Sequence, residues 1–292
     1  MPWFPLALAT AFFAATEMAI LKRWFSDLTA VEMGMAPLIF LAPIFAVMLA
    51  AIPWPELSPG FLPLFLAVQP VNAAGFLCHI SALHRSPMSL TMPLLSFTPA
   101  FAVLTGRLVL GESLNGPELV GIATIVAGGY VLGMSRERRG ALAPVRAVLR
   151  DSGARRMLAA SAIYALGVVM GKALILKSSP LFFMSATYCV FAPCMVLGFG
   201  LAGKVRFRRV LARPLPALAA ALVMFLHATC HNLAIARSAA APMLAVKRLS
   251  GAFSVIYGGL IFKERDLGYR LLGALVMGAG AAVLALFSAG TP

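Results

Sequence analysis

Runs of about 20 apolar residues recur along this chain of 292 residues, and they constrain its fold more than any other feature. The hydrocarbon core of a bilayer is about 30 Å thick, so a helix needs roughly 20 apolar residues to cross it. About ten runs reach that length, separated by short turn-like segments. Only 12% of the residues are charged, about half the share typical of soluble domains. The sequence therefore predicts an all-α polytopic membrane protein with ten transmembrane helices.

The ten predicted helices divide into two groups of five. A polar linker at residues 135–156 separates a first half, residues 1–134, from a second half, residues 157–292, within one integral membrane domain. Prolines inside the third and fourth runs, Pro70, Pro93 and Pro99, predict kinks. The predicted helices cover residues 3–21, 30–51, 61–83, 88–110, 117–134, 157–176, 181–202, 215–236, 240–262 and 267–287.

Lysine and arginine are distributed unevenly between the two sets of loops. Eighteen of the 24 lie in or beside the loops that follow the first, third, fifth, seventh and ninth runs. The opposite loops hold only Lys177 and Arg237, and the remaining four lie inside apolar runs. Because cytoplasmic loops carry an excess of these residues, we predict a cytoplasmic linker at 135–156 and both termini outside. The predicted location is the plasma membrane, which in a bacterium is the inner membrane.

Charge and motif content disfavour other classes of function. The formal net charge of +14 follows from the basic loops, so it does not indicate a nucleic-acid partner. The four cysteines lie in apolar runs without zinc-site spacing, and no metal or cofactor is predicted. Because the HExxH motif and a GxSxG motif with its partners are missing, an intramembrane enzyme is the least favoured class. The predicted partners are the lipid bilayer and a small-molecule substrate, and the oligomeric state stays open.

An internal repeat relates the two halves. A shift of 152 residues aligns residues 78–134 with 230–286 without a gap, and 18 of the 57 positions are identical. The identical pairs include Cys-His at 78–79 and 230–231, and Glu112 with Glu264. Each half has an odd number of predicted helices, so the halves enter the membrane in opposite orientations. Inverted repeats of this kind place a substrate site near the midplane, between the halves of a secondary transporter.

Residues 82–133 resemble the first repeat of the EamA family in the drug/metabolite transporter superfamily. The resemblance rests on the Gly-Glu turn at 111–112 with its glycine-rich following helix, and on Lys-Glu at 263–264 before the last apolar run. It implies ten helices and the export or exchange of a small metabolite. It does not identify the substrate, because the family carries many.

Lys247 and Arg248 are adjacent within the ninth apolar run. An ionisable residue inside a span costs about 2.5–3.5 kcal/mol on insertion scales, so each requires a polar cavity, an acid or an anion. Lysine supplies a compact ammonium and arginine a planar fork of donors, which together match a phosphate or carboxylate. The alternative is a structural role, in which both cations contact internal acids and backbone carbonyls.

The segment around this pair is similar to the ninth helix of the triose-phosphate translocators, where a Lys-Arg pair holds the substrate phosphate. Those translocators also have a lysine in the fourth helix, and the corresponding position here is Leu95. The internal repeat independently pairs Leu95 with Lys247. This difference disfavours a dianionic triose phosphate and favours a monocarboxylate or a zwitterion.

Glu17 is the acid placed deep inside a predicted helix. At a rise of 1.5 Å per residue, its depth differs from that of Lys247 by roughly 14 Å in a core of about 30 Å. This argues against a direct ion pair and leaves the carboxylate free to bind a substrate amine or a coupling proton. The first-helix glutamate has that role in the related small multidrug resistance transporters. A purely structural contact is the alternative.

Two histidines are candidates for the same site. His227 and His231 are four residues apart on one helical face, near the depth of Lys247, where they could bond an anion or relay a proton. A pair of this kind without a third ligand is weak support for a metal site. The candidates for cavity lining are Gln69, Asn72, Tyr164 and Tyr188.

Several residues near helix ends are predicted to have structural roles. Lys172 is expected to extend towards the membrane surface. Glu112 and Glu264 are expected to cap the connections before the fifth and tenth helices. The glycines predicted to allow close helix packing are Gly121, Gly128, Gly273 and Gly280.

The residues and the resemblance together favour a secondary transporter of a small anionic or zwitterionic metabolite that works by alternating access. Its substrate's acid group would be held by Lys247 and Arg248, with His227 and His231 nearby. The alternative is an exporter of amines or drug-like cations coupled to protons through Glu17. The sequence leaves open the direction of transport, and whether protons or a counter-substrate drive it.

Overall fold

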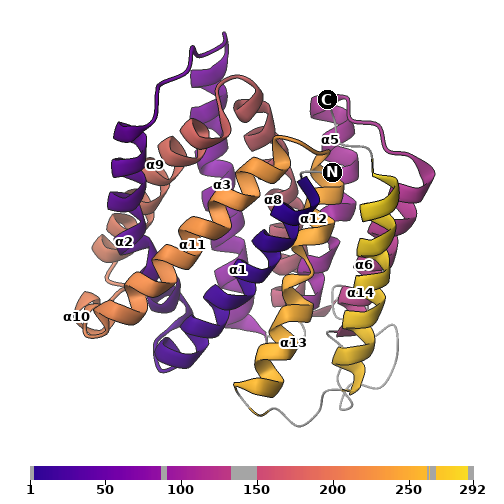
Figure 1. The fold of residues 1–292 in the computed structure, drawn as a ribbon. Helices are drawn as coiled ribbons and strands as arrows, with labels where there is room; N and C mark the ends of the chain where they lie inside the picture. Colours follow the sequence, from indigo (N-terminus) through magenta and orange to yellow (C-terminus); the bar gives the residue numbers. More distant parts are fainter. Residues whose placement is uncertain (1–2, 87–90, 133–149, 262, 264–267, 289–292) are drawn as a thin grey trace.

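The computed structural model describes residues 3–86, 91–132, 150–261, 263 and 268–288, and within these ranges every regular element is a helix (Figure 1). Seven described helices are long and apolar enough to cross a membrane, namely α1, α2, α3, α8, α9, α11 and α14. The chain is therefore an integral, polytopic membrane protein. The elements are α1 (Trp3–Phe25), α2 (Ala30–Ala51), α3 (Phe61–Arg85), η1 (Met92–Phe97), α5 (Thr98–Leu110), α6 (Gly116–Leu132), α8 (Ser152–Leu176), α9 (Pro180–Leu201), α10 (Phe207–Leu211), α11 (Pro214–Ile235), α12 (Ala240–Lys247), α13 (Ser250–Leu260) and α14 (Gly268–Phe287).

Three predicted helices differ from the observed ones in informative ways. The helix α8 begins at Ser152, not at 157, because the Asp151 side chain accepts a hydrogen bond from the Ala154 amide at 2.7 Å and caps it. Within the described residues, the predicted fourth helix comprises the 3₁₀ segment η1 and α5, and the predicted ninth is divided into α12 and α13. The helix α3 continues through Pro70.

The two ends of the helical bundle are held by different contacts. At one end, the Ser58 amide donates to the Lys177 carbonyl at 3.0 Å, and the Asn115 side chain donates to the Phe287 carbonyl at 3.2 Å. These bonds join the α2–α3 connection to the end of α8, and the start of α6 to the end of α14. The start of α1 lies at this end as well (Figure 1). We call it the termini end.

The opposite end, which we call the basic end, is held by ion pairs. The Arg206 guanidinium contacts buried Glu32 at 2.8 Å, and Arg213 contacts Asp27 at 2.6 Å, so the segments around α10 are fixed to the α1–α2 connection. The hydrogen bond from Arg213 holds the pKa of the exposed Asp27 carboxyl below its usual value. Glu32 also completes a capping box with Thr29, which explains why α2 begins at Ala30.

The helices α6 and α14 pack side by side at very close range (Figure 1). A Cβ atom added at Gly128 would lie 2.6 Å from the Met277 backbone nitrogen, and one at Gly280 would lie 2.7 Å from the Gly121 carbonyl oxygen. The predicted close-packing role is therefore confirmed for Gly121, Gly128 and Gly280, since only glycine lets the two backbones approach this closely.

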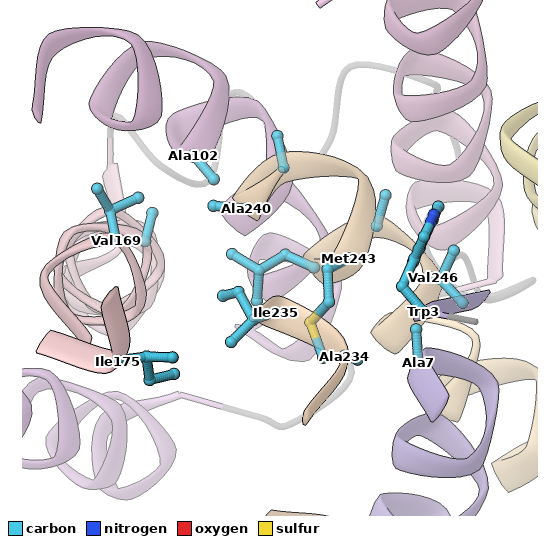
Figure 2. Packing of buried hydrophobic residues seen from close by; sticks show 14 of the residues in the cluster. Trp3, Ala7, Ala102, Val169, Ile175, Ala234, Ile235, Ala240, Met243 and Val246 are labelled. Carbon is cyan, nitrogen blue, oxygen red and sulfur yellow. The ribbon is translucent and has the colours of Figure 1, made fainter. Parts of the chain in front are cut away.

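The largest hydrophobic cluster lies towards the termini end. It joins residues from α1, α3, α8, α11 and α12, and its buried members include Trp3, Val169, Ile235 and Met243. Figure 2 shows Ile235 and Met243 between Val169 on one side and Trp3 on the other. The helices of both halves are thus packed together at this end.

Candidate functional site

A cavity of about 460 Å³ lies among α1, α2, α3, α8, α9, α11 and α12. Helices from both halves of the chain contribute to its wall. Much of the wall is apolar, with Phe76, Phe183, Phe191 and Met224 among the larger side chains. The polar side chains on the wall are Glu17, Asn72, His79, Tyr164, Lys172, Thr187, Tyr188, His227, His231, Asn232 and Lys247.

The structure brings most of the predicted site residues to this one cavity. Its lining includes Lys247, Glu17 and both His227 and His231, together with the predicted lining residues Asn72, Tyr164 and Tyr188. Two predicted residues, Arg248 and Gln69, are not among the residues that line it. Both have buried polar atoms without a hydrogen-bond partner among the described residues, namely the Arg248 Nε and both amide atoms of Gln69.

Lys247 lies where the helix is interrupted. It is the last residue of α12, and the Arg248 amide donates to the Leu244 and Ala245 carbonyls in a tightened final turn. The helix α13 then starts at Ser250. In the first half, α5 starts after η1 at Thr98, and Thr98 and Ser250 are equivalent in the 152-residue repeat. The interruption therefore falls at the same repeat position in both halves.

The two adjacent cations share some neighbours and differ in others. The charge of Lys247 interacts with Glu17, His227 and His231. The charge of Arg248 also interacts with His227 and His231, and in addition with His79 on α3 and Tyr164 on α8. Because consecutive helical residues point about 100° apart, Lys247 lines the cavity whereas Arg248 does not.

The Glu17 carboxylate is within hydrogen-bond distance of a histidine. Its Oε2 lies 3.2 Å from the His227 Nδ1, with both side chains largely buried. The prediction that the carboxylate is left free is therefore wrong. The depth argument considered only Lys247 as a partner, whereas α1 packs along α11, which carries His227. Among the described residues no ion pair joins Glu17 to Lys247, although both line the same cavity.

A second histidine contact lies on the first-half side of the cavity. His79 Nδ1 is 3.2 Å from the Tyr164 hydroxyl, so the wall contributed by α3 and α8 also carries an imidazole. Sequence reasoning treated His79 only as the repeat partner of His231. The repeat itself was the signal that could have placed both histidines on the cavity wall.

Lys172 has a different role from the predicted one. Its side chain is only 5% exposed, and its Nζ lies 2.5 Å from Glu112 Oε1 and 2.6 Å from the Ser238 carbonyl oxygen. The prediction that it extends to the membrane surface is wrong, because a buried acid from the other half is within reach. Glu112 was expected to cap the connection before the fifth helix, but its Oε2 accepts the Ala240 amide at the start of α12. Glu264 lies outside the described residues.

Two buried polar atoms on residues that line the cavity have no hydrogen-bond partner among the described residues. They are the His231 Nδ1 and the Thr187 Oγ1. Burying a polar atom without a partner costs about 1–3 kcal/mol. A bound polar molecule or ordered water would remove that cost, but both atoms are covered by neighbouring atoms in the present arrangement.

Comparison with known proteins gives a family and a fold. Residues 1–134 match the EamA-like transporter family, which confirms the predicted resemblance of the first half to that family. One solved structure, titled only as the crystal structure of a protein, aligns with a TM-score of 0.72 at 14% identity, over 98% of this chain and 97% of the other. At that identity the match establishes the shared fold alone. No curated protein matches the sequence.

Proposed function

We propose that this protein, a membrane transporter whose residues 1–134 match the EamA-like family, is a secondary transporter of a small anionic or zwitterionic metabolite. In this proposal Lys247 holds the acid group of the substrate in the central cavity. The observation that carries it is a cavity-lining ammonium without an ion-pair partner among the described residues. His231 and Thr187 on the same wall carry buried polar atoms without a partner among the described residues, and a carboxylate would reach them once neighbouring side chains move.

Alternating access between two inverted repeats is supported by how the helices pack. By their order in the two halves, α3 corresponds to α11 and α8 corresponds to α1. The α3–α8 contact therefore corresponds to the α11–α1 contact, and both are extensive. The α2–α9 and α6–α14 contacts each correspond to themselves, as any two-fold axis that relates the halves requires. The shared interruption at Thr98 and Ser250 supports the same symmetry.

One pair of contacts that the repeat makes equivalent differs in extent between the two halves. The α2–α11 contact is extensive, whereas its repeat equivalent between α9 and α3 is sparse. A transporter that works by alternating access breaks its symmetry in this way, because each state closes one side and opens the other. We propose that the present arrangement is one of these two states, with ten crossings in total.

The orientation proposed for this fold places both termini outside and the linker at 135–156 in the cytoplasm. The basic end carries the arginine-rich α10 segment, which favours its placement at the cytoplasmic surface. Reporter fusions after Gly140 and after Pro292 should give cytoplasmic activity for the first and external activity for the second. Cytoplasmic activity at Pro292 would contradict this orientation.

The substrate class is tested with purified protein in liposomes. A panel of radiolabelled amino acids, monocarboxylates, phosphoesters and amines is loaded, and exchange or uptake is measured for each. We expect saturable transport of at least one carboxylate or zwitterion, with lower activity towards dianionic phosphoesters. Transport confined to amines would contradict the proposal.

An exporter of amines or drug-like cations is the second candidate, because Glu17 places a carboxylate on the cavity wall. The two candidates respond differently to Glu17→Gln. If the substrate is a cation held by Glu17, its affinity should fall by at least about 30-fold, since a charged contact is worth about 2–5 kcal/mol. If the substrate is an anion held by Lys247, its affinity should be retained or increase, because a nearby negative charge is removed.

A further inference from the structure

The contact between Lys172 and Glu112 links three parts of the molecule that are far apart in sequence. Lys172 belongs to α8, and Glu112 lies in the α5–α6 connection of the first half. The Lys172 Nζ also donates to the Ser238 carbonyl at 2.6 Å, and the Glu112 Oε2 accepts the Ala240 amide at 2.9 Å. The connection between α11 and α12 is therefore held from both sides by one ion pair.

This ion pair is buried and well supplied with hydrogen bonds. The exposed fractions of the Lys172 and Glu112 side chains are 5% and 10%, at a separation of 2.5 Å. Removing two charges from water is costly, and the cost is offset only where geometry is good and the remaining donors and acceptors are satisfied. Here the Ser238 carbonyl and the Ala240 amide provide that additional bonding.

The pair lies where the cavity is closed. Lys172 lines the cavity at its termini end beside Ile175, Phe183 and Ile235, which are 4%, 7% and 1% exposed. Towards the basic end the wall is more accessible, since Met18 is 41% exposed and Met33 is partly exposed. The ion pair thus joins the α5–α6 connection, α8 and the start of α12 at the closed end of the cavity.

We propose that the Lys172–Glu112 ion pair is a latch that holds the cavity closed at the termini end, and that it breaks when the cavity opens there. The proposal rests on the alternating-access function proposed above. The latch also fixes the start of α12, whose last residue is Lys247. Opening at this end would therefore move the helix that carries the proposed substrate-binding lysine.

An ion pair suits this task better than apolar contacts of the same area. When the helices separate, water reaches both side chains, and hydration replaces the lost Coulomb attraction. Apolar side chains exposed in the same movement would gain no such compensation. A buried ion pair at a moving contact is therefore strong while closed and inexpensive once open.

Hydrogen–deuterium exchange of the full-length protein in detergent tests the latch without a substrate. The variant is Lys172→Met, which removes the cation and keeps most of the side-chain length. Amides in residues 172–184 and 232–247, at the termini end, should exchange about tenfold faster or more. Amides in residues 17–38, which line the cavity towards the basic end, should exchange more slowly, because opening at one end closes the other.

The opposite signs of these two changes distinguish a latch from a merely stabilising contact. Faster exchange at both ends, faster exchange confined to residues 232–247, or no change would each overturn the proposal. Glu112→Gln should act in the same direction as Lys172→Met, because it leaves the lysine unpaired. If either single variant fails to fold, the double variant Lys172→Met/Glu112→Gln removes both buried charges and gives the same readout.

Lys177→Met is the matched control. Lys177 lies five residues further along the same chain segment, and its Nζ donates to the Pro59 carbonyl at an exposed position. The variant Lys177→Met makes the same change of charge at the same end of the molecule, and Lys177 does not line the cavity. Its exchange should match that of the native protein. A negative exchange result would contradict the latch but not substrate binding at Lys247. A negative result with the substrate panel would contradict the proposed substrate but not the exchange result.

Discussion

Lys247→Met should reduce the affinity for a transported carboxylate by at least about 30-fold, since losing one partner of a desolvated charged contact costs about 2–5 kcal/mol. The ammonium lines the central cavity, so the substrate's acid group would lose its proposed ionic partner. The measurement is binding by isothermal titration, using the carboxylate or zwitterion that gives the highest transport activity in liposomes. Lys204→Met, an exposed loop residue at the basic end, is the control for loss of one positive charge.

Thermal stability measured on the same variant separates substrate binding from a structural role. Lys247 is partly buried and has no ion-pair partner among the described residues, so enclosing its charge costs free energy that methionine would not incur. We therefore expect Lys247→Met to melt at the same temperature as the native protein or above it, while binding is lost. A variant that melts at a lower temperature but binds normally would show that the lysine is structural.

Arg248 is expected to act less directly. It does not line the cavity, and its Nε has no partner among the described residues. Arg248→Lys keeps the charge but removes the planar fork, so a role in bidentate recognition predicts a loss of affinity close to that of Lys247→Met. A role confined to the electrostatic field near His79 and Tyr164 predicts that Arg248→Lys binds normally.

The sequence was sufficient for those features that depend on local pattern. Apolar runs predict the described helices to within a few residues, and an ionisable pair inside one run indicates Lys247 as a site residue. The 152-residue repeat indicated that equivalent positions in the halves behave alike, and the interruptions at Thr98 and Ser250 fit this. Each of these inferences needs only neighbouring residues or an alignment of the chain with itself.

Contacts between the halves could not be predicted in the same way. The position of Lys172 near a helix end predicts that its side chain extends to the membrane surface, yet Glu112 reaches it from 60 residues away. The prediction that Glu17 has no partner compares its depth in the membrane only with that of Lys247, and it assumes straight helices perpendicular to the membrane. The pairing of α1 with α11 then brings His227 to it. Such pairings follow from the lateral arrangement of helices, which composition and periodicity do not specify.

The contact between α6 and α14 should be the most sensitive to added volume. A Cβ at position 128 would lie 2.6 Å from the Met277 nitrogen and 2.8 Å from the Gly273 oxygen, both backbone atoms that cannot rotate away. Gly128→Val therefore requires the two helices to move apart. Overpacking of this kind commonly costs about 1–3 kcal/mol and sometimes more. We expect a clear fall in the apparent melting temperature of the detergent-solubilised protein.

Gly278→Ala is the matched control for this prediction, because it lies on the same pair of helices and meets no atom within 4 Å. Alanine has a higher helix propensity than glycine by up to about 1 kcal/mol, so this variant should be as stable as the native protein or more stable. The α6–α14 contact is its own equivalent under the repeat, so both halves depend on it in either state of the cavity. Equal melting temperatures for Gly128→Val and Gly278→Ala would contradict the close-packing role, because only position 128 brings a side chain against the partner backbone.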